Sequence, residues 1–74
     1  MKQEIKHYIA KAKTGVLFIP DMGSISPFVV RGRSLETRKE DALWEINSMR
    51  DHDGLERLSK LPRGLGMVFE PVYA

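Results

Sequence analysis

The sequence predicts a small α+β domain, in which a mainly antiparallel three-stranded sheet carries a main helix on one of its faces. Two observations lead to this class. Three short runs of β-branched and aromatic residues, bounded by turn-forming residues, are typical of strands. Between the second and third run, a longer segment combines helical periodicity with a capping signal. The chain has 74 residues without an internal repeat or linker, so we expect residues 1–74 to form a single domain.

The N-terminal segment, residues 2–13, is predicted to form a helix. Its apolar side chains follow the i, i+3, i+4, i+7 spacing of one helix face: Ile5, Tyr8, Ile9 and Ala12. Gly15 follows at a position suited to a helix C-terminus. The alternative is a strand that turns at Thr14 and Gly15 into the next strand. The helical spacing favours the helix.

The three predicted strands are short. The first covers residues 16–19 and is stopped by Pro20, and the second covers residues 28–30. Because turn-forming residues lie between them, we expect these two runs to form an antiparallel hairpin with a loose loop. The last strand covers residues 67–73 and contains Pro71, which indicates an edge position or a strand that ends there.

The main helix is predicted from Thr37 to Asp51. Thr37 and Glu40 have the spacing of a capping box, and Gly54 is suited to end the helix in a left-handed conformation. A second, short helix is predicted over residues 53–61, before the last strand. Its apolar positions are Leu55, Leu58 and Leu61, and Pro62 closes it.

The charges are unevenly distributed, although the net charge is only +2. Residues 1–34 hold six basic and two acidic side chains, a balance of +4. Residues 35–56 hold three basic and seven acidic side chains, a balance of −4, and residues 57–74 hold three basic and one acidic, a balance of +2. The surface is therefore expected to be dipolar rather than uniformly basic.

Composition excludes several classes of protein. The chain has no cysteine, so disulfides and cysteine-based zinc sites are ruled out. It has no apolar run as long as a signal peptide's core or a membrane span. We therefore expect a soluble, cytoplasmic protein, which acts in the host cytoplasm if it is viral, and no membrane partner. Self-association as a homodimer is an alternative to the monomer, since so small a domain buries a modest fraction of its surface.

Trp44 is the only tryptophan, and helical geometry places it roughly opposite the apolar face of the main helix. That face is formed by Ala42, Leu43, Ile46 and Met49. The side chains around Trp44 are polar or acidic: Glu40, Asp41, Asn47, Ser48 and Asp51. Two explanations remain open. Trp44 either packs under the N-terminal segment as part of the core, or it anchors a binding partner.

No motif indicates catalysis. The only cluster that resembles a reactive or metal-binding site is Asp51-His52-Asp53, and we interpret it as the polar end of the main helix. The serines lack a nucleophile-elbow motif, and Gly64-Leu65-Gly66 lacks the rest of a phosphate-binding fingerprint. We therefore expect a protein that is not an enzyme and that needs no cofactor and no metal.

Nucleic-acid binding is the alternative function. Arg31 and Arg33 leave a strand, and Arg38 and Lys39 lie at the start of the main helix. These four side chains form a potential basic stripe for phosphate groups. The acidic side chains in the same helix oppose this interpretation, because they repel phosphate.

Protein binding is the function that the sequence favours. A tryptophan beside carboxylates, with arginines nearby, has the composition of an interface hot spot. The predicted contact residues are Trp44, Glu40, Asp41, Glu45 and Asp51. The plan of hairpin, helix and strand, with Leu61-Pro62 and Gly64-Leu65-Gly66 before the last strand, resembles small phage-encoded inhibitors of host machinery, such as anti-CRISPR proteins and inhibitors of host RNA polymerase. The resemblance implies an inhibitor or adaptor of a larger protein and identifies no functional residue.

Overall fold

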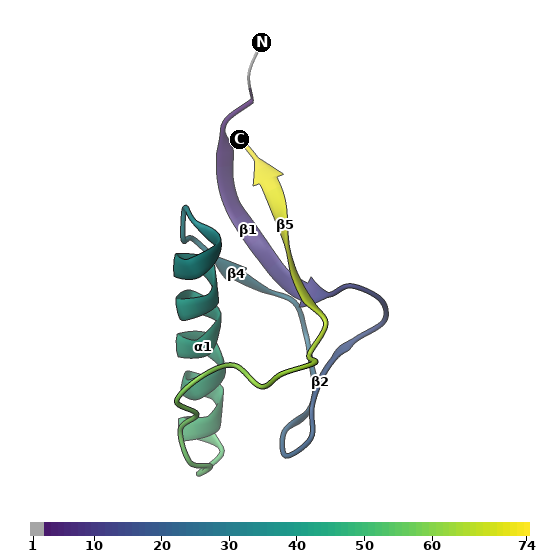
Figure 1. The fold of residues 1–74 in the computed structure, drawn as a ribbon, viewed down its shortest axis with the longest axis vertical. Helices are drawn as coiled ribbons and strands as arrows, with labels where there is room; N and C mark the ends of the chain where they lie inside the picture. Colours follow the sequence, from purple (N-terminus) through teal and green to yellow (C-terminus); the bar gives the residue numbers. More distant parts are fainter. Residues whose placement is uncertain (1–2) are drawn as a thin grey trace.

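A computed structural model describes residues 3–74 as a small α+β fold with a three-stranded antiparallel sheet and one helix (Figure 1). The elements in chain order are β1 (Ile5–Ala12), β2 (Leu17–Ile19), β3 (Gly23–Ile25), β4 (Phe28–Val30), α1 (Leu35–His52) and β5 (Met67–Tyr73). The main sheet has the strand order β4-β1-β5, and β2 and β3 form a separate two-stranded sheet. The predicted fold class is confirmed, whereas the two additional helices are not present among the residues described.

The N-terminal segment forms the strand β1, so the prediction of a helix over residues 2–13 was wrong for residues 3–13, and residue 2 lies outside the described residues. Tyr8, Ala10 and Ala12 alternate along β1 and face the core, and the last two are buried. β1 is the central strand, and both of its edges pair with neighbours. This pairing satisfies the backbone of β1 on two sides, which local helical spacing cannot anticipate.

The predicted hairpin between residues 16–19 and residues 28–30 does not form, because each of these strands pairs with another strand. β2 pairs with β3, with Leu17 opposite Ile25, while β4 pairs with β1. The turn between β2 and β3 is closed by a hydrogen bond from Met22 N to Ile19 O, and Gly23 has a φ of 83°. A left-handed residue at this position favours glycine, so the segment assigned to a loose loop contains a tight turn and a strand.

Pro71 lies on an edge strand, as the sequence predicted. β5 pairs only with β1 in the described sheet, and Pro71 is opposite Tyr8. Lys13 N donates to Gly66 O at the start of this ladder. Because hydrogen-bonded and non-hydrogen-bonded pairs alternate in an antiparallel ladder, the pair of Tyr8 and Pro71 is a non-bonded one. The position without an N–H therefore faces the free edge, where no ladder bond is lost.

The main helix starts earlier than predicted. Its N-cap is Ser34, and the predicted capping box of Thr37 and Glu40 was wrong. Thr37 N donates to Ser34 Oγ at 3.1 Å, and Ser34 N donates to Thr37 Oγ1 at 3.0 Å. Threonine thus takes the place that glutamate usually holds in a capping box. The prediction for Gly54 was correct, since it follows the C-cap residue with a φ of 74°.

The segment after α1 is irregular rather than helical, so the short helix predicted over residues 53–61 was wrong. Asn47 holds both backbone groups of Leu58: its Nδ2 donates to Leu58 O at 3.0 Å, and Leu58 N donates to its Oδ1 at 2.7 Å. Leu55 N donates to Arg50 O. Because these backbone groups are bonded to α1, a separate helix would have to break them.

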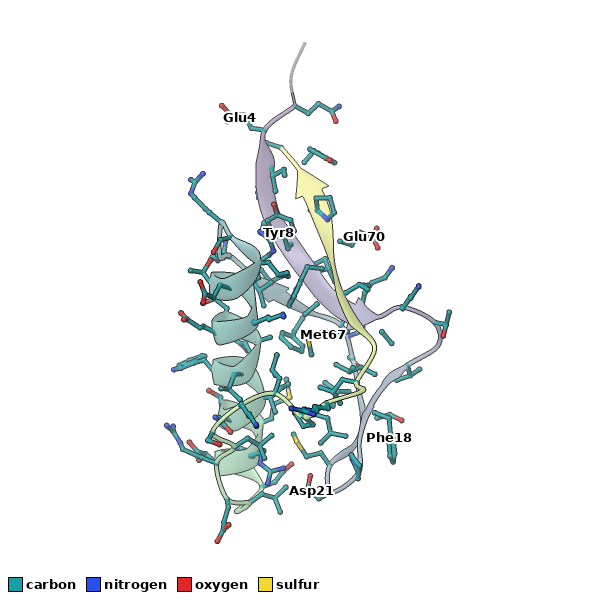
Figure 2. All side chains as sticks on the ribbon, viewed as in Figure 1. Glu4, Tyr8, Phe18, Asp21, Met67 and Glu70 are labelled. Carbon is teal, nitrogen blue, oxygen red and sulfur yellow. The ribbon has the colours of Figure 1, made fainter. Side chains whose placement is uncertain are left out.

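The core lies between α1 and one face of the sheets. Two adjoining clusters of buried residues form it: Ala12, Leu17, Ile19, Ile25 and Ile46 in one, and Ala10, Val30 and Ala42 in the other. Ala10 and Ala42 are fully buried, and such small side chains allow the helix to approach the sheet closely. Figure 2 shows Tyr8 and Met67 on the side of the sheet that faces α1, whereas Glu70 points away.

The N-cap at Ser34 predicts a specific pattern of stability changes. Ser34→Ala removes the acceptor for Thr37 N and should lower the free energy of unfolding by about 1 kcal/mol. Ser34→Asp keeps an acceptor and should retain most of the stability. Urea denaturation followed by circular dichroism measures both. Equal stability of the alanine variant and the wild type would contradict the assignment of Ser34 as the cap.

Asn47 provides a second stability prediction. Asn47→Ala leaves the N–H and C=O of Leu58 without their partner and should cost about 1–3 kcal/mol. Asn47→Asp keeps the acceptor but loses the donor, so its loss should be intermediate. Ser48→Ala, at the next position, is the matched control and should change stability little. An Asn47→Ala variant as stable as this control would show that the two bonds contribute nothing.

Candidate functional site

Trp44 lies on the surface of α1 and not in the core. Its side chain is 64% exposed, so the alternative in which the N-terminal segment covers it does not hold. Beside it is a shallow hollow of about 220 Å³ between α1 and β4. The hollow is lined by Val29, Val30, Arg31, Asp41, Trp44 and Glu45. An exposed indole thus borders an apolar strand edge and two carboxylates.

The predicted acidic contact residues are only partly brought together. Asp41 and Glu45 share the hollow with Trp44, and Asp41 Oδ2 accepts a hydrogen bond from Arg31 N at 3.2 Å. Glu40 lies one turn before Trp44 but lines a different hollow. Asp51 lies two turns after Trp44 and is paired with Arg57 at 2.7 Å, which lowers the pKa of the Asp51 carboxyl.

The basic residues of the alternative function are divided among three places. Arg31 and Arg33 line a polar hollow of about 530 Å³ together with Lys6. Arg38 is held inside the fold, because its guanidinium lies 4.0 Å from the centre of the Tyr8 ring and Nη1 donates to Gly32 O. Lys39 lines a hollow on another side of the helix. The predicted stripe is therefore not continuous.

The Asp51-His52-Asp53 cluster lies at the C-terminal end of α1. Asp51 is bonded to Arg57, and Asp53 is the C-cap residue. Among residues 3–74, no three His, Asp or Glu side chains are arranged to hold a metal ion. The side chains at this helix end therefore do not converge on one point.

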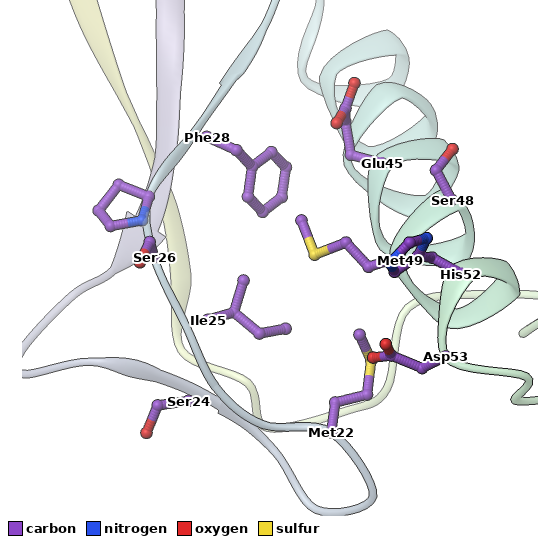
Figure 3. A pocket seen from close by; sticks show the side chains of 11 residues that line it. Met22, Ser24, Ile25, Ser26, Phe28, Glu45, Ser48, Met49, His52 and Asp53 are labelled. Atoms are coloured by element: carbon purple, nitrogen blue, oxygen red, sulfur yellow. The ribbon is translucent and has the colours of Figure 1, made fainter.

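A larger groove, which sequence reasoning missed, lies between α1 and the β2–β4 segment. Its volume is about 710 Å³. Figure 3 shows Met22, Ile25 and Phe28 on one side and Met49 on the other, all directed into the same space. Carboxylates of Glu45 and Asp53 lie at its rim. Helical periodicity placed Met49 on the apolar face of α1, but it could not show that the facing segment leaves an opening beside it.

An ion pair between the buried Arg50 and the half-exposed Asp21 connects the two walls of this groove. The Arg50 side chain is 5% exposed, and its Nη1 lies 2.8 Å from Asp21 Oδ1 at the tip of the β2–β3 hairpin. Arg50 Nε donates to Glu56 O, in the segment that follows α1. The hydrogen bond and the charge of Arg50 lower the pKa of the Asp21 carboxyl. Arg50 thereby joins the hairpin, the helix and the following segment.

Comparisons with protein-family models, curated proteins and solved structures find no match for this chain. Among residues 3–74, no helix has both the length and the apolar character needed to cross a membrane. The geometry of the described side chains is therefore the basis for assigning a function.

The Asp21–Arg50 pair predicts a pH dependence of stability. Because the folded-state pKa of Asp21 lies below its ordinary value of 3.8, the pair stabilises the fold above that pH. This contribution should be lost as the pH falls through the lowered pKa. Asp21→Asn removes it at every pH. Asp51 titrates in the same direction, so the quantity to follow is the difference in unfolding free energy between wild type and Asp21→Asn.

This difference should be largest near neutral pH and should shrink below pH 3.8. Chemical denaturation at a series of pH values measures it. A difference that is constant down to strongly acidic pH would contradict a stabilising role for the charged carboxylate.

Proposed function

We propose that the protein is a small, non-catalytic protein-binding module that acts in the cytoplasm as an inhibitor or adaptor of a larger protein. The exposure of Trp44 is the observation that carries this proposal. Tryptophan is enriched among residues that dominate binding energy, and burial of its ring on binding removes a large apolar surface from water. The proposed contact surface combines Trp44 with Asp41 and Glu45, which line the same hollow. It also includes Glu40, one turn before Trp44 on α1, and Asp51, two turns after it.

The surroundings of Trp44 support a protein partner. Val29 on β4 is 39% exposed and lines the same hollow, so the apolar area extends beyond the helix. Polar side chains border this area, which is the arrangement of a protein interface with an apolar centre and a polar rim. The concrete form of the proposal is a phage-encoded inhibitor of host machinery, in line with the resemblance in size and plan.

Nucleic-acid binding has less support from the geometry. Arg38 is already bound to Tyr8 and Gly32, and Lys39 lies apart from Arg31 and Arg33. A phosphate backbone needs several cations along one continuous path. The remaining group of Lys6, Arg31 and Arg33 provides a local positive surface of smaller extent.

Trp44→Ala separates binding from folding. Because the ring is 64% exposed, the variant should melt close to the wild-type temperature. Its affinity for the partner should fall by about 2 kcal/mol or more, as expected for a hot-spot tryptophan. Affinity capture from cells with the wild type and the variant, followed by mass spectrometry, identifies the partner. Calorimetry with the purified partner then measures the loss.

Leu35→Ala is the matched control, because Leu35 lies on the same helix and is 54% exposed. This variant should keep the partner. If Trp44→Ala retains every protein captured by the wild type, Trp44 is not the anchor. If Trp44→Ala unfolds, the side chain contributes to the core and the proposed contact is wrong.

A further inference from the structure

We propose that the groove between α1 and the β2–β4 segment binds a basic peptide segment of the partner, with an apolar side chain inserted between Met49 and Phe28. This inference rests on the proposed function, because it specifies which chemistry the protein partner presents. It assigns a binding role to residues outside the Trp44 hollow.

The floor of the groove is apolar and adaptable. Met22, Phe28 and Met49 are partly buried and pack against the core cluster that contains Ile25. Each therefore has one side fixed by the core and another side open to the groove. Methionine side chains are flexible and polarisable, so they adjust to the shape of an entering apolar group. The volume of this open groove, about 710 Å³, lies within the range of ligand-binding sites.

The rim determines the charge of the partner. Two carboxylates, Glu45 and Asp53, line the groove together with His52, and no lysine or arginine does. Among residues 3–74, neither carboxylate side chain has a hydrogen bond or an ion pair with the protein, unlike Asp21 and Asp51. Their charges are thus available to a ligand. An acidic segment would be repelled, whereas a lysine or arginine next to the inserted apolar residue would be attracted.

Glu45 connects the groove with the tryptophan. It lines both the groove and the hollow beside Trp44. A cation bound at Glu45 therefore comes close to the face of an exposed indole, where cation–π attraction adds to the ion pair. The combination favours arginine or lysine at this point of the partner. One bound segment would then extend from the groove, across Glu45, to Trp44.

Selection from a random library of displayed peptides of about 12 residues tests the proposal with the 74-residue chain. The selected sequences should contain an aliphatic or aromatic residue followed closely by lysine or arginine. The most enriched sequence, synthesised with a fluorescent label, is then titrated by fluorescence anisotropy. Wild type should bind it, and Asp53→Lys should weaken binding about tenfold, which corresponds to about 1.4 kcal/mol.

Asp53→Lys is chosen because it reverses charge in the groove without threatening the fold. Asp53 is at the C-terminus of α1, where a cation suits the helix dipole better than a carboxylate. Glu4→Lys makes the same charge change at the end of the molecule opposite Asp21 (Figure 2) and should leave binding within about twofold of wild type. Glu45→Lys should weaken binding at least as much as Asp53→Lys, because it faces both hollows.

The outcomes separate this inference from the proposed function. Enrichment of acidic peptides, a failure to enrich any peptide, or equal binding by wild type and Asp53→Lys would overturn the groove inference. If the groove inference fails but Trp44→Ala still loses a captured partner, the proposed function remains valid without the groove. A concentration-dependent dimer that Asp53→Lys abolishes would show that a second copy of the chain occupies the groove, which also overturns the inference.

Discussion

The burial of Arg50 is the constraint on which the β2–β3 hairpin and the segment after α1 depend. A guanidinium that is almost completely removed from water must have its charge and its donors satisfied, or it destabilises the fold strongly. Asp21 supplies the charge from the hairpin tip, and Glu56 O supplies an acceptor from the segment after α1. Neither of these two segments has a long secondary-structure element of its own. Their places are set by what the arginine requires.

Asn47, one turn before Arg50, extends the same principle to neutral groups. Asn47 is buried and is hydrogen-bonded to both the N–H and the C=O of Leu58, as the backbone of a neighbouring strand would be. Together, Asn47 and Arg50 hold the irregular segment that follows α1 against the helix through hydrogen bonds to its backbone. A chain of 74 residues without cysteine thereby orders a loop without a disulfide. No residue of this segment after Asp53 lines the groove.

The elements that sequence predicted correctly are those determined by local chemistry. The central part of α1, the strand that contains Pro71 and the left-handed Gly54 each follow from periodicity or from the properties of a single residue. The capping box was misplaced by three residues, because Ser34 and Thr37 take the roles predicted for Thr37 and Glu40. The other errors concern long-range partners. The spacing of Ile5 and Tyr8 fits a helix, but pairing with β4 and β5 makes β1 a strand. The spacing of Leu55 and Leu58 suggested a helix, but the backbone N–H and C=O of Leu58 are hydrogen-bonded to the side chain of Asn47.

For the candidate site, the sequence could indicate that Trp44 lies on the polar side of α1, but it could not indicate the geometry around it. The helical position of Trp44 correctly placed it away from the apolar face, and its exposure agrees with that. The groove beside Met49 depends on the hairpin pairing of β2 with β3, which was predicted differently, so no local signal could have located it. The same reason explains Arg38, whose stacking on Tyr8 requires β1 to be a strand.

The free edge of β5 has a consequence for how the protein behaves at high concentration. An exposed edge strand is a template on which other chains add in register, and this is the first step of fibril growth. At Pro71, an incoming strand finds a carbonyl but no donor, so the ladder cannot continue along the full length of β5. Proline at this position thus combines a normal place in the sheet with resistance to aggregation, a property that no contact within the single molecule reveals.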